Sequence, residues 1–414
     1  MALDKVIDSA VLDAGLTSVA DAIRARGGTS EQLAFPGGFV SAVEGIQAGG
    51  GTPEIVLPDT PGRAYMTLAP SSVEEVVTMS CTASDKDGRS VFSIGNVKNG
   101  TFVPESELVT VNLGFEASRN ITVPAHDEIK VLEVKGYSQD GEEARLTRCL
   151  FYNYNSPVIL DIKINSEIEI YRGGTSSSQA TRSVRKWALN ADAIGGDQSY
   201  LAFQYAGCDE IDLSRVTWPV LNEVNSMFLN SACRRIVIPN FMPEGSTAKS
   251  LLQMFDGCAN LMEIVGLDTW NLSKVSNIKW AFRWCQSLQE LDLSSWGQYS
   301  SNFTNIDGFN RYCTQLKTIN LSGWNVGHLT RVYDVFDGCN SLENIIMDGT
   351  TWFPYSFKLS SCNNLTVESL NAVIAALPTL AEGTTQTLTL GSTNIAKLTE
   401  DKIAVATGKG WTVA

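Results

Sequence analysis

The stretch that decides the fold is residues 282–296, which read FRWCQSLQELDLSSW. Its cysteine, Cys285, is followed at fixed intervals by Leu288, Leu291 and Leu293. The leucine part predicts a short strand with one buried face, and the residues up to the cysteine predict a short amphipathic turn or helix. Neither part can bury its apolar face alone, so the stretch predicts a unit that must pack against copies of itself.

The same unit recurs through the second half of the chain. Consecutive repeat cysteines are separated by 25, 25, 27, 28, 26 and 23 residues: Cys208, Cys233, Cys258, Cys285, Cys313, Cys339 and Cys362. Such periods are typical of stacked repeats with a continuous core. A small apolar thiol suits a buried column, and no two cysteines have the close spacing of a metal site. We predict that all seven are core thiols that hold no metal.

These repeats resemble a known family. MFDGCANL at 254–261 and VFDGCNSL at 335–342 resemble BspA-like (bacterial-surface-protein) leucine-rich repeats, as do LDLSSW at 291–296 and INLSGW at 319–324. The resemblance implies a curved leucine-rich-repeat solenoid, assigned here to residues 198–365, that serves adhesion and ligand binding and not catalysis.

Residues 366–414 predict a cap for the last repeat. The apolar spacing predicts a helix over 367–377, a strand over 387–390 and a last helix around 400–407. A terminal unit with a polar outer edge lets a repeat stack end without exposing its core.

Residues 1–52 predict two short helices, which end in a flexible GGGTP run at 49–53. Two short helices in about 50 residues cannot build much of a core. We therefore expect this segment to pack against copies of itself or against a larger assembly. A helical hairpin that docks on the next domain is the alternative.

Both ends of the chain resemble a single class of proteins. AIRARGGTS at 22–30 and FPGGF at 35–39 are similar to the N-termini of tail-associated structural proteins of phages and prophages. LTLGSTN at 388–394 and AVATGKGW at 404–411 resemble the closing cap of the same class. The resemblance implies that residues 1–50 attach to other phage tail or baseplate proteins, and analogy with tail fibres implies a homotrimer.

Residues 53–172 predict a β-sandwich-like domain. Strand patterns such as IKVLEVKGY at 129–137 and VILDIKI at 158–164 alternate with turn signals such as SQDG at 138–141. Residues 173–197, which begin with a glycine- and serine-rich run, predict a linker and an N-terminal cap of the solenoid.

The β-rich domain also contains carboxylates that could bind calcium or act as a glycosidase pair. They are Asp85, Asp87, Glu105, Glu107, Asp127, Glu128, Glu142 and Glu143. Carboxylate clusters on an acidic protein are usually solvated surface, and we expect that here. Cys81 and Cys149 are expected to be core thiols rather than a bridge.

Composition excludes several classes of function. The chain has 45 acidic and 31 basic residues, a net charge of −14, which disfavours binding to a nucleic-acid backbone. The histidines, His126 and His328, are only two, which excludes His-rich zinc centres and leaves little material for Ser–His or Cys–His catalysis. We predict that the protein is not an enzyme and needs no cofactor.

The N-terminus, MALDKVID, carries charges where a signal peptide needs an apolar core, and no apolar run approaches 18 residues. We therefore expect no membrane insertion. Synthesis in a reducing cytosol argues against disulfides. The expected location is the virion, in the phage tail, after assembly in the host cytoplasm.

Equivalent positions of adjacent units locate a candidate binding surface. The position before the repeat cysteine is Gly257, Trp284, Tyr312 and Gly338 in turn, and the one before it is Asp256, Arg283, Arg311 and Asp337. Trp280 lies four residues before Trp284, on the same face if this turn is helical. We predict an exposed aromatic–cationic patch of Trp280, Arg283, Trp284, Arg311 and Tyr312. Its rings and guanidinium donors suit a sugar or a protein hot spot; alternatively, the rings complete the core or a subunit contact.

The expected architecture is multidomain α+β: a short helical attachment segment, a β-sandwich-like domain, and a capped solenoid. The expected function is that of a phage tail-fibre or baseplate receptor-binding protein, which attaches the virion to a host cell-surface glycan or protein. The alternatives are a tailspike-like glycan depolymerase, which would need two opposed carboxylates, a purely structural tail component, and a bacterial surface adhesin, which would need an export signal or wall anchor.

Overall fold

The computed structural model describes residues 55–60, 62–83, 87–112, 119–144, 146–152, 159–165, 184–189, 203–218, 220–329 and 332–414. This described part is mixed α/β, with many strands, few helices and no closed barrel. From Leu57 onward it belongs to one compact unit, Leu57–Ala414. The predicted attachment segment 1–52 lies outside the described residues, and so does most of the predicted linker 173–197. Among the helices that are described, none combines the length and the apolar character needed to cross a bilayer.

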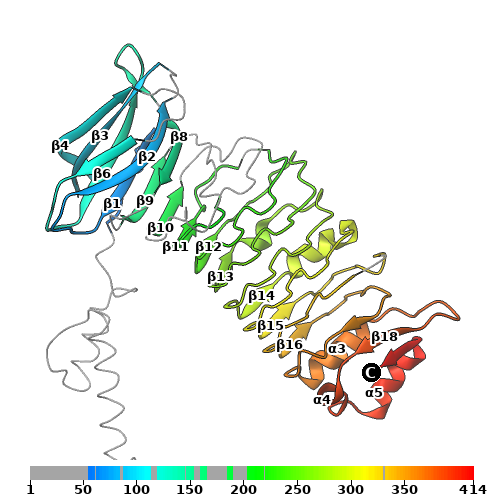
Figure 1. Ribbon diagram of the computed structural model, residues 1–414. Coiled ribbons are helices and arrows are strands. Elements are labelled where there is room, and N and C mark those ends of the chain that lie inside the picture. The colour runs from blue at the N-terminus through cyan, green and yellow to red at the C-terminus, as the bar shows by residue number, and fades with distance from the viewer. Residues whose placement is uncertain are drawn as a thin grey trace, which may run out of the picture. The chain divides into compact units, whose positions relative to one another are not determined.

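Two sets of antiparallel strands open the described part of the chain (Figure 1). The first runs in the order β4-β3-β6-β1-β9, with β7 beside β6, and the second in the order β5-β2-β8. Alternate side chains of both, such as Met66 on β1 and Val77 on β2, belong to the same hydrophobic cluster. The strands are β1 (Arg63–Leu68), β2 (Glu75–Ala83), β3 (Arg89–Lys98), β4 (Thr101–Asn112), β5 (Arg119–Val123), β6 (Lys130–Tyr137), β7 (Glu143–Ala144), β8 (Leu146–Tyr152) and β9 (Ile159–Asn165).

The strands and the turn predicted in this part are confirmed. β6 and β9 fall on the predicted stretches 129–137 and 158–164. Between β6 and β7 the Gly141 N–H donates to the Ser138 carbonyl at 3.0 Å, and Gly141 has a φ of 89°, which glycine adopts easily. Cys81 and Cys149 are backbone partners in the β2–β8 ladder.

Short parallel strands then follow one another at the repeat period. β10 (Val184–Leu189), β11 (Cys208–Asp212), β12 (Arg235–Val237) and β13 (Glu263–Val265) extend the first sheet beyond β9. β14 (Glu290–Asp292), β15 (Thr318–Asn320) and β16 (Asn344–Ile346) form a separate parallel sheet. Equivalent residues pair across units, for example Leu291 with Ile319. The strand predicted in each of these units is therefore present, and neighbouring units pair in register.

Each unit also ties its neighbour to itself through a buried side chain. The thiol of Cys285 donates to the Phe255 carbonyl of the preceding unit at 3.2 Å, and the thiol of Cys313 to the Phe282 carbonyl at 3.1 Å. The indole N–H of Trp296 donates in the same way to the Leu267 carbonyl at 3.1 Å. A buried carbonyl without a partner is costly, so a small donor at a fixed position satisfies the backbone of each unit inside the core.

All seven repeat cysteines are buried, but the first two are not free thiols. Cys208 and Cys233 form a disulfide, with their Cα atoms 4.9 Å apart. The prediction that disulfides are absent is wrong for this pair. Stacking places equivalent positions of consecutive units side by side, at a separation within the range of a disulfide. The remaining five, Cys258, Cys285, Cys313, Cys339 and Cys362, are free.

The predicted cap elements are confirmed. α3 (Val367–Ala376) begins at Thr366, whose hydroxyl accepts the Ser369 N–H as an N-cap. α4 (Ser392–Ile395) and α5 (Glu400–Gly408) follow, and β17 (Phe357–Lys358), β18 (Gln386–Thr389) and β19 (Trp411–Val413) form a parallel sheet. Two short 3₁₀ helices, η1 (Leu267–Thr269) and η2 (Ser294–Asn302), lie between the repeat strands.

Candidate ligand-binding site

The segments that lead to the repeat cysteines are turns and not helices. In the unit of Cys285, the N–H of Ala281 donates to the Ile278 carbonyl and that of Arg283 to the Trp280 carbonyl, three residues back in each case. The N–H of Trp280 instead reaches the Asp307 carbonyl of the next unit at 3.1 Å. A helix would use these donors within the segment. The segment is the turn, and not the helix, of the two predicted alternatives, so the condition under which Trp280 and Trp284 would share a helical face is not met.

The turns create two columns of left-handed residues along one edge of the stack. The first edge column comprises Ser226, Gln253, Trp280, Gly308 and Asp334, with φ between 52° and 56°. The second edge column comprises Tyr205, Asn230, Gly257, Trp284, Tyr312 and Gly338, with φ between 56° and 76°. A positive φ suits glycine and costs a bulky residue about 1–2 kcal/mol. The backbone is thus the same in every unit, while the side chain varies widely.

Trp284 and Tyr312 are consecutive members of the second edge column and pack against each other. Their ring centroids are 4.3 Å apart, and Trp284 is 40% exposed. The Tyr312 ring lies over the next member of the column, Gly338, where a Cβ atom would be 2.2 Å from Cδ1 of the tyrosine. Since glycine occupies the same column at 257 and 338, the turn itself does not require an aromatic residue at either place.

Trp280 is enclosed by cations of this chain and not by a second ring. Nζ of Lys279 and Cζ of Arg283 each lie 4.1 Å from its ring centroid, as in cation–π contacts. Its side chain is half-buried and lies beside Gly308 of the next unit. Lys279 was not among the predicted site residues, because the prediction compared only the two positions before each repeat cysteine, and Lys279 lies at neither of them.

The guanidinium of Arg283 is held by an aspartate of the preceding unit. Nε and Nη2 donate to the two carboxylate oxygens of Asp256 at 2.9 and 2.6 Å. Asp256 is 3% exposed and also accepts a hydrogen bond from the amide of Gln253 at 3.0 Å. This bidentate pair fixes the arginine side chain.

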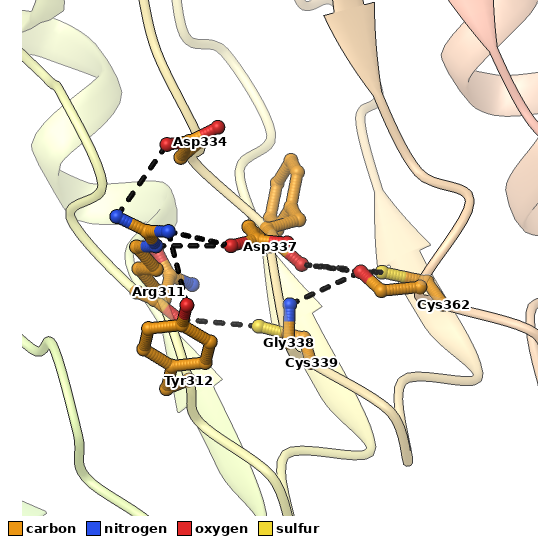
Figure 2. Close-up of polar contacts among 10 residues, drawn as sticks. Arg311, Tyr312, Asp334, Asp337, Gly338, Cys339 and Cys362 are labelled. Atoms are coloured by element: carbon orange, nitrogen blue, oxygen red, sulfur yellow. Dashed lines mark hydrogen bonds and ion pairs between the residues drawn. The ribbon is translucent and has the colours of Figure 1, made fainter.

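Arg311 is held in the opposite direction, by the unit that follows. Its guanidinium donates to Asp337 at 3.0 Å and to the Tyr312 hydroxyl at 3.0 Å, and it lies 3.5 Å from Asp334 (Figure 2). Burial alone would lower the pKa of Arg311, but the hydrogen bond to Asp337 and the charge of Asp334 outweigh it and raise the pKa. The guanidinium donors that we predicted would serve a ligand are thus engaged within the protein: Arg283 and Arg311 are both ion-paired.

The structure therefore divides the five predicted patch residues into two contact groups. Trp280 contacts Arg283, and Trp284 contacts Tyr312, which contacts Arg311. The groups adjoin, because Arg283 and Trp284 are consecutive residues, and because a Cβ atom added to Gly308 would lie 3.1 Å from Trp280 and 3.5 Å from Arg311. Asp334 completes the second group. It lies two residues before Phe336, as Trp280 lies two residues before Phe282, so a comparison of these equivalent positions could have located it.

The repeat cysteines offer no reactive thiolate. Burial raises the pKa of Cys313 and of Cys362 to about 12, and it raises the pKa of Cys285 well above its usual value. A thiol that stays protonated at neutral pH is a poor nucleophile and a poor metal ligand. In the part of the chain that is described, no group of three or more histidine, cysteine or acidic side chains could hold a metal ion.

Several of the carboxylates that were considered as calcium ligands or as a glycosidase pair form ion pairs. Glu105 lies 3.0 Å from Lys130, and Glu143 lies 3.0 Å from Arg63. Glu128 also pairs with Lys130, at 3.8 Å. Asp85 lies outside the described residues. These pairs have the character of a salt-bridged surface.

Two hollows lie away from the patch. One, of about 330 Å³, lies where the pairing of repeat strands is interrupted between β13 and β14, and Asp268, Glu290 and Asp292 are among its lining residues. The other is lined in part by Ser71 and His126. There the Ser71 hydroxyl donates to the Val73 carbonyl, and Nδ1 of His126 lies 2.7 Å from the Glu128 carbonyl oxygen. These two side chains are therefore not arranged as a nucleophile and its base.

Comparison with known proteins relates the repeat units to a family of unknown function. Residues 242–353 match a family model described as a Mycoplasma protein of unknown function, DUF285. The match covers the repeat units that contain Trp280, Trp284 and Tyr312. The searches of curated proteins and of solved structures returned no match to this chain.

Proposed function

We propose that this protein is a non-catalytic recognition protein, which binds a cell-surface ligand through the edge of its repeats at Trp284 and Tyr312. The observation that carries the proposal is that two large aromatic residues occupy adjacent left-handed positions at which the flanking units have glycine. A residue kept in an unfavourable backbone conformation on the surface is better explained by a function than by the fold.

The repeats are proposed to form a BspA-like leucine-rich-repeat solenoid, and the two opening sheets a β-sandwich. Support for the solenoid comes from the in-register parallel strands, for example Ile236 with Ile264, and from the cysteine and tryptophan columns. Support for the sandwich comes from the buried side chains that the two sheets place in one cluster.

The proposed setting is a phage tail fibre or baseplate, to which residues 1–50 attach the protein. This part rests on the resemblance of both ends of the chain to tail-associated proteins. A homotrimer would present three copies of the patch, so that weak single sites could act together. A structure of the assembled particle tests it: residues 1–50 should lie against a tail protein, and density for this chain anywhere else would reject it.

Binding of the labelled full-length chain to cells tests the recognition function. The cells are those of the bacterium whose genome or prophage carries the sequence, or of the host of the phage that carries it. We expect saturable binding and a loss of more than tenfold in the Trp284→Gly variant. Tyr205→Gly is the matched control, because Tyr205 has the same left-handed conformation in the same column. The next member of the column after Tyr205 is Asn230, which has no ring. Equal loss in both variants, or no binding by the native chain, would contradict the proposal.

A further inference from the structure

We propose that the ligand of the Trp284–Tyr312 pair is an uncharged carbohydrate, a neutral hexose or N-acetylhexosamine unit of a surface glycan. The inference rests on the function proposed above and names the ligand class of the same site. It follows from which groups of the patch are free to contact a ligand and which are not.

The free surface is an aromatic face. Trp284 is 40% exposed although the Tyr312 ring packs against it, so part of the indole remains in contact with solvent. The negative face of an aromatic ring attracts the weakly positive C–H groups that line one side of a pyranose. Trp280 does not provide such a surface, because Lys279 and Arg283 both lie against it.

Both arginines of the patch are already ion-paired. Arg283 is bound bidentately by Asp256, and Arg311 by Asp337 and Asp334. An anionic ligand such as a sialic acid, a uronic acid or a phosphate would have to displace one of these charge-assisted pairs. The chain as a whole carries a net charge of −14, which disfavours the approach of an anion. Charge therefore selects against acidic glycans.

The polar groups beside the rings suit hydroxyl donors. The side chains of Asp334 and Asp337 are 45% and 38% exposed, and Arg311 holds both of them in place. The same guanidinium also donates to the Tyr312 hydroxyl, so Arg311 links these carboxylates to one ring of the aromatic pair (Figure 2). A carboxylate oxygen fixed in this way has lone pairs left to accept sugar hydroxyls. An aromatic platform with carboxylate acceptors at its border matches a neutral sugar.

A glycan array probed with the full-length chain tests the ligand class. It should carry neutral oligosaccharides of glucose, galactose, mannose and N-acetylglucosamine together with sialylated, sulfated and uronic-acid glycans. We expect binding to neutral members, with affinity that changes less than twofold between 0.05 and 0.5 M NaCl. Trp284→Gly should weaken this binding at least tenfold, while Tyr205→Gly should bind as the native chain does. The melting temperatures of both variants should stay near that of the native chain. Binding confined to acidic glycans, or an affinity that falls steeply with salt, would overturn the inference.

Treated cells separate a failed inference from a failed function. Binding that is lost after periodate oxidation of the cells, and kept after protease treatment, supports a glycan. Binding that is lost only after protease treatment identifies a protein receptor: it overturns the carbohydrate assignment and leaves the recognition function intact. A native chain that binds neither the array nor untreated cells overturns both.

Discussion

The interior and the edge of the stacked units differ in what they keep constant. In the interior the side chain is constant: a cysteine recurs in each unit, and from Cys258 onward its thiol donates to a carbonyl of the preceding unit. At the edge the backbone is constant, with a positive φ in each unit, while the residue changes from Gly257 to Trp284. Burial demands one size and one donor, whereas an exposed turn demands only a conformation. The variable edge, and not the constant interior, is therefore where recognition can be specified.

The largest effect is expected at alkaline pH and tests the interior. In the folded state burial raises the pKa of Cys313 and Cys362 to about 12, so the folded chain keeps protons that the unfolded chain loses above about pH 8.5. The stability that each buried thiol contributes is thus complete below about pH 8.5. Above that pH the free energy of unfolding falls by about 1.4 kcal/mol per pH unit for each buried thiol. Urea unfolding between pH 7 and 10.5, followed by tryptophan fluorescence, measures this slope. Cys313→Ala should make it shallower by one thiol's share, and an unchanged slope would contradict the account.

Gly338→Ala tests the edge. A Cβ atom there would meet the Tyr312 ring at 2.2 Å, in a backbone with a φ of 76°. Strain of about 1–2 kcal/mol and overpacking of about 1–3 kcal/mol together predict a loss of about 2–5 kcal/mol. Gly323→Ala is the control, because its φ is 75° but no described atom lies within 4 Å of the added Cβ, so only the strain remains. Urea unfolding compares the two, and equal losses would show that the Tyr312 ring does not lie over Gly338.

The Cys208–Cys233 disulfide distinguishes the first units from the rest of the column. It closes a loop with a sequence separation of 25, which corresponds to about 3 kcal/mol of stability. We expect a reducing agent to lower the free energy of unfolding by about that amount. The double variant Cys208→Ala, Cys233→Ala should be insensitive to the same reductant. If mass spectra of the native chain show Cys208 and Cys233 as two free thiols, the whole cysteine column is reduced and the disulfide is absent.

The smallest change in stability is expected for Trp284→Gly, which sharpens the contrast between edge and interior. Loss of the ring contact with Tyr312 costs about 0.5–1.5 kcal/mol, and release of the left-handed strain returns about 1–2 kcal/mol. The net change should therefore lie between a loss of about 0.5 kcal/mol and a gain of about 1.5 kcal/mol. Trp296→Ala removes the same residue type from the core and should cost about 3–5 kcal/mol. Similar losses in the two variants, measured by urea unfolding, would place Trp284 in the core and remove the case for a binding surface.

Much of the interior and one half of the candidate site could be predicted from residue spacing. The recurrence of Cys285, Leu288 and Leu291 identifies which residues face inward, and the aromatic pair was found by comparing equivalent positions. The other half could not be predicted. The comparison of equivalent positions places Asp256 in the unit before Arg283, 27 residues earlier, but residue spacing does not show which way the two side chains turn, and in the structure they meet at 2.6 Å.

The sequence by itself determined the length of the repeat unit, the inward residues and the cap elements α3, β18 and α5, because burial imposes a period on apolar side chains along the chain. Only the tertiary structure decided the left-handed edge, the disulfide at Cys208, the ion pairs of the two arginines and the interruption between β13 and β14. Each of these depends on how one unit is placed on the next. Apart from the cysteine and tryptophan donors, that placement is set by backbone hydrogen bonds between units, which every residue type except proline can donate and which therefore leave no pattern in the sequence.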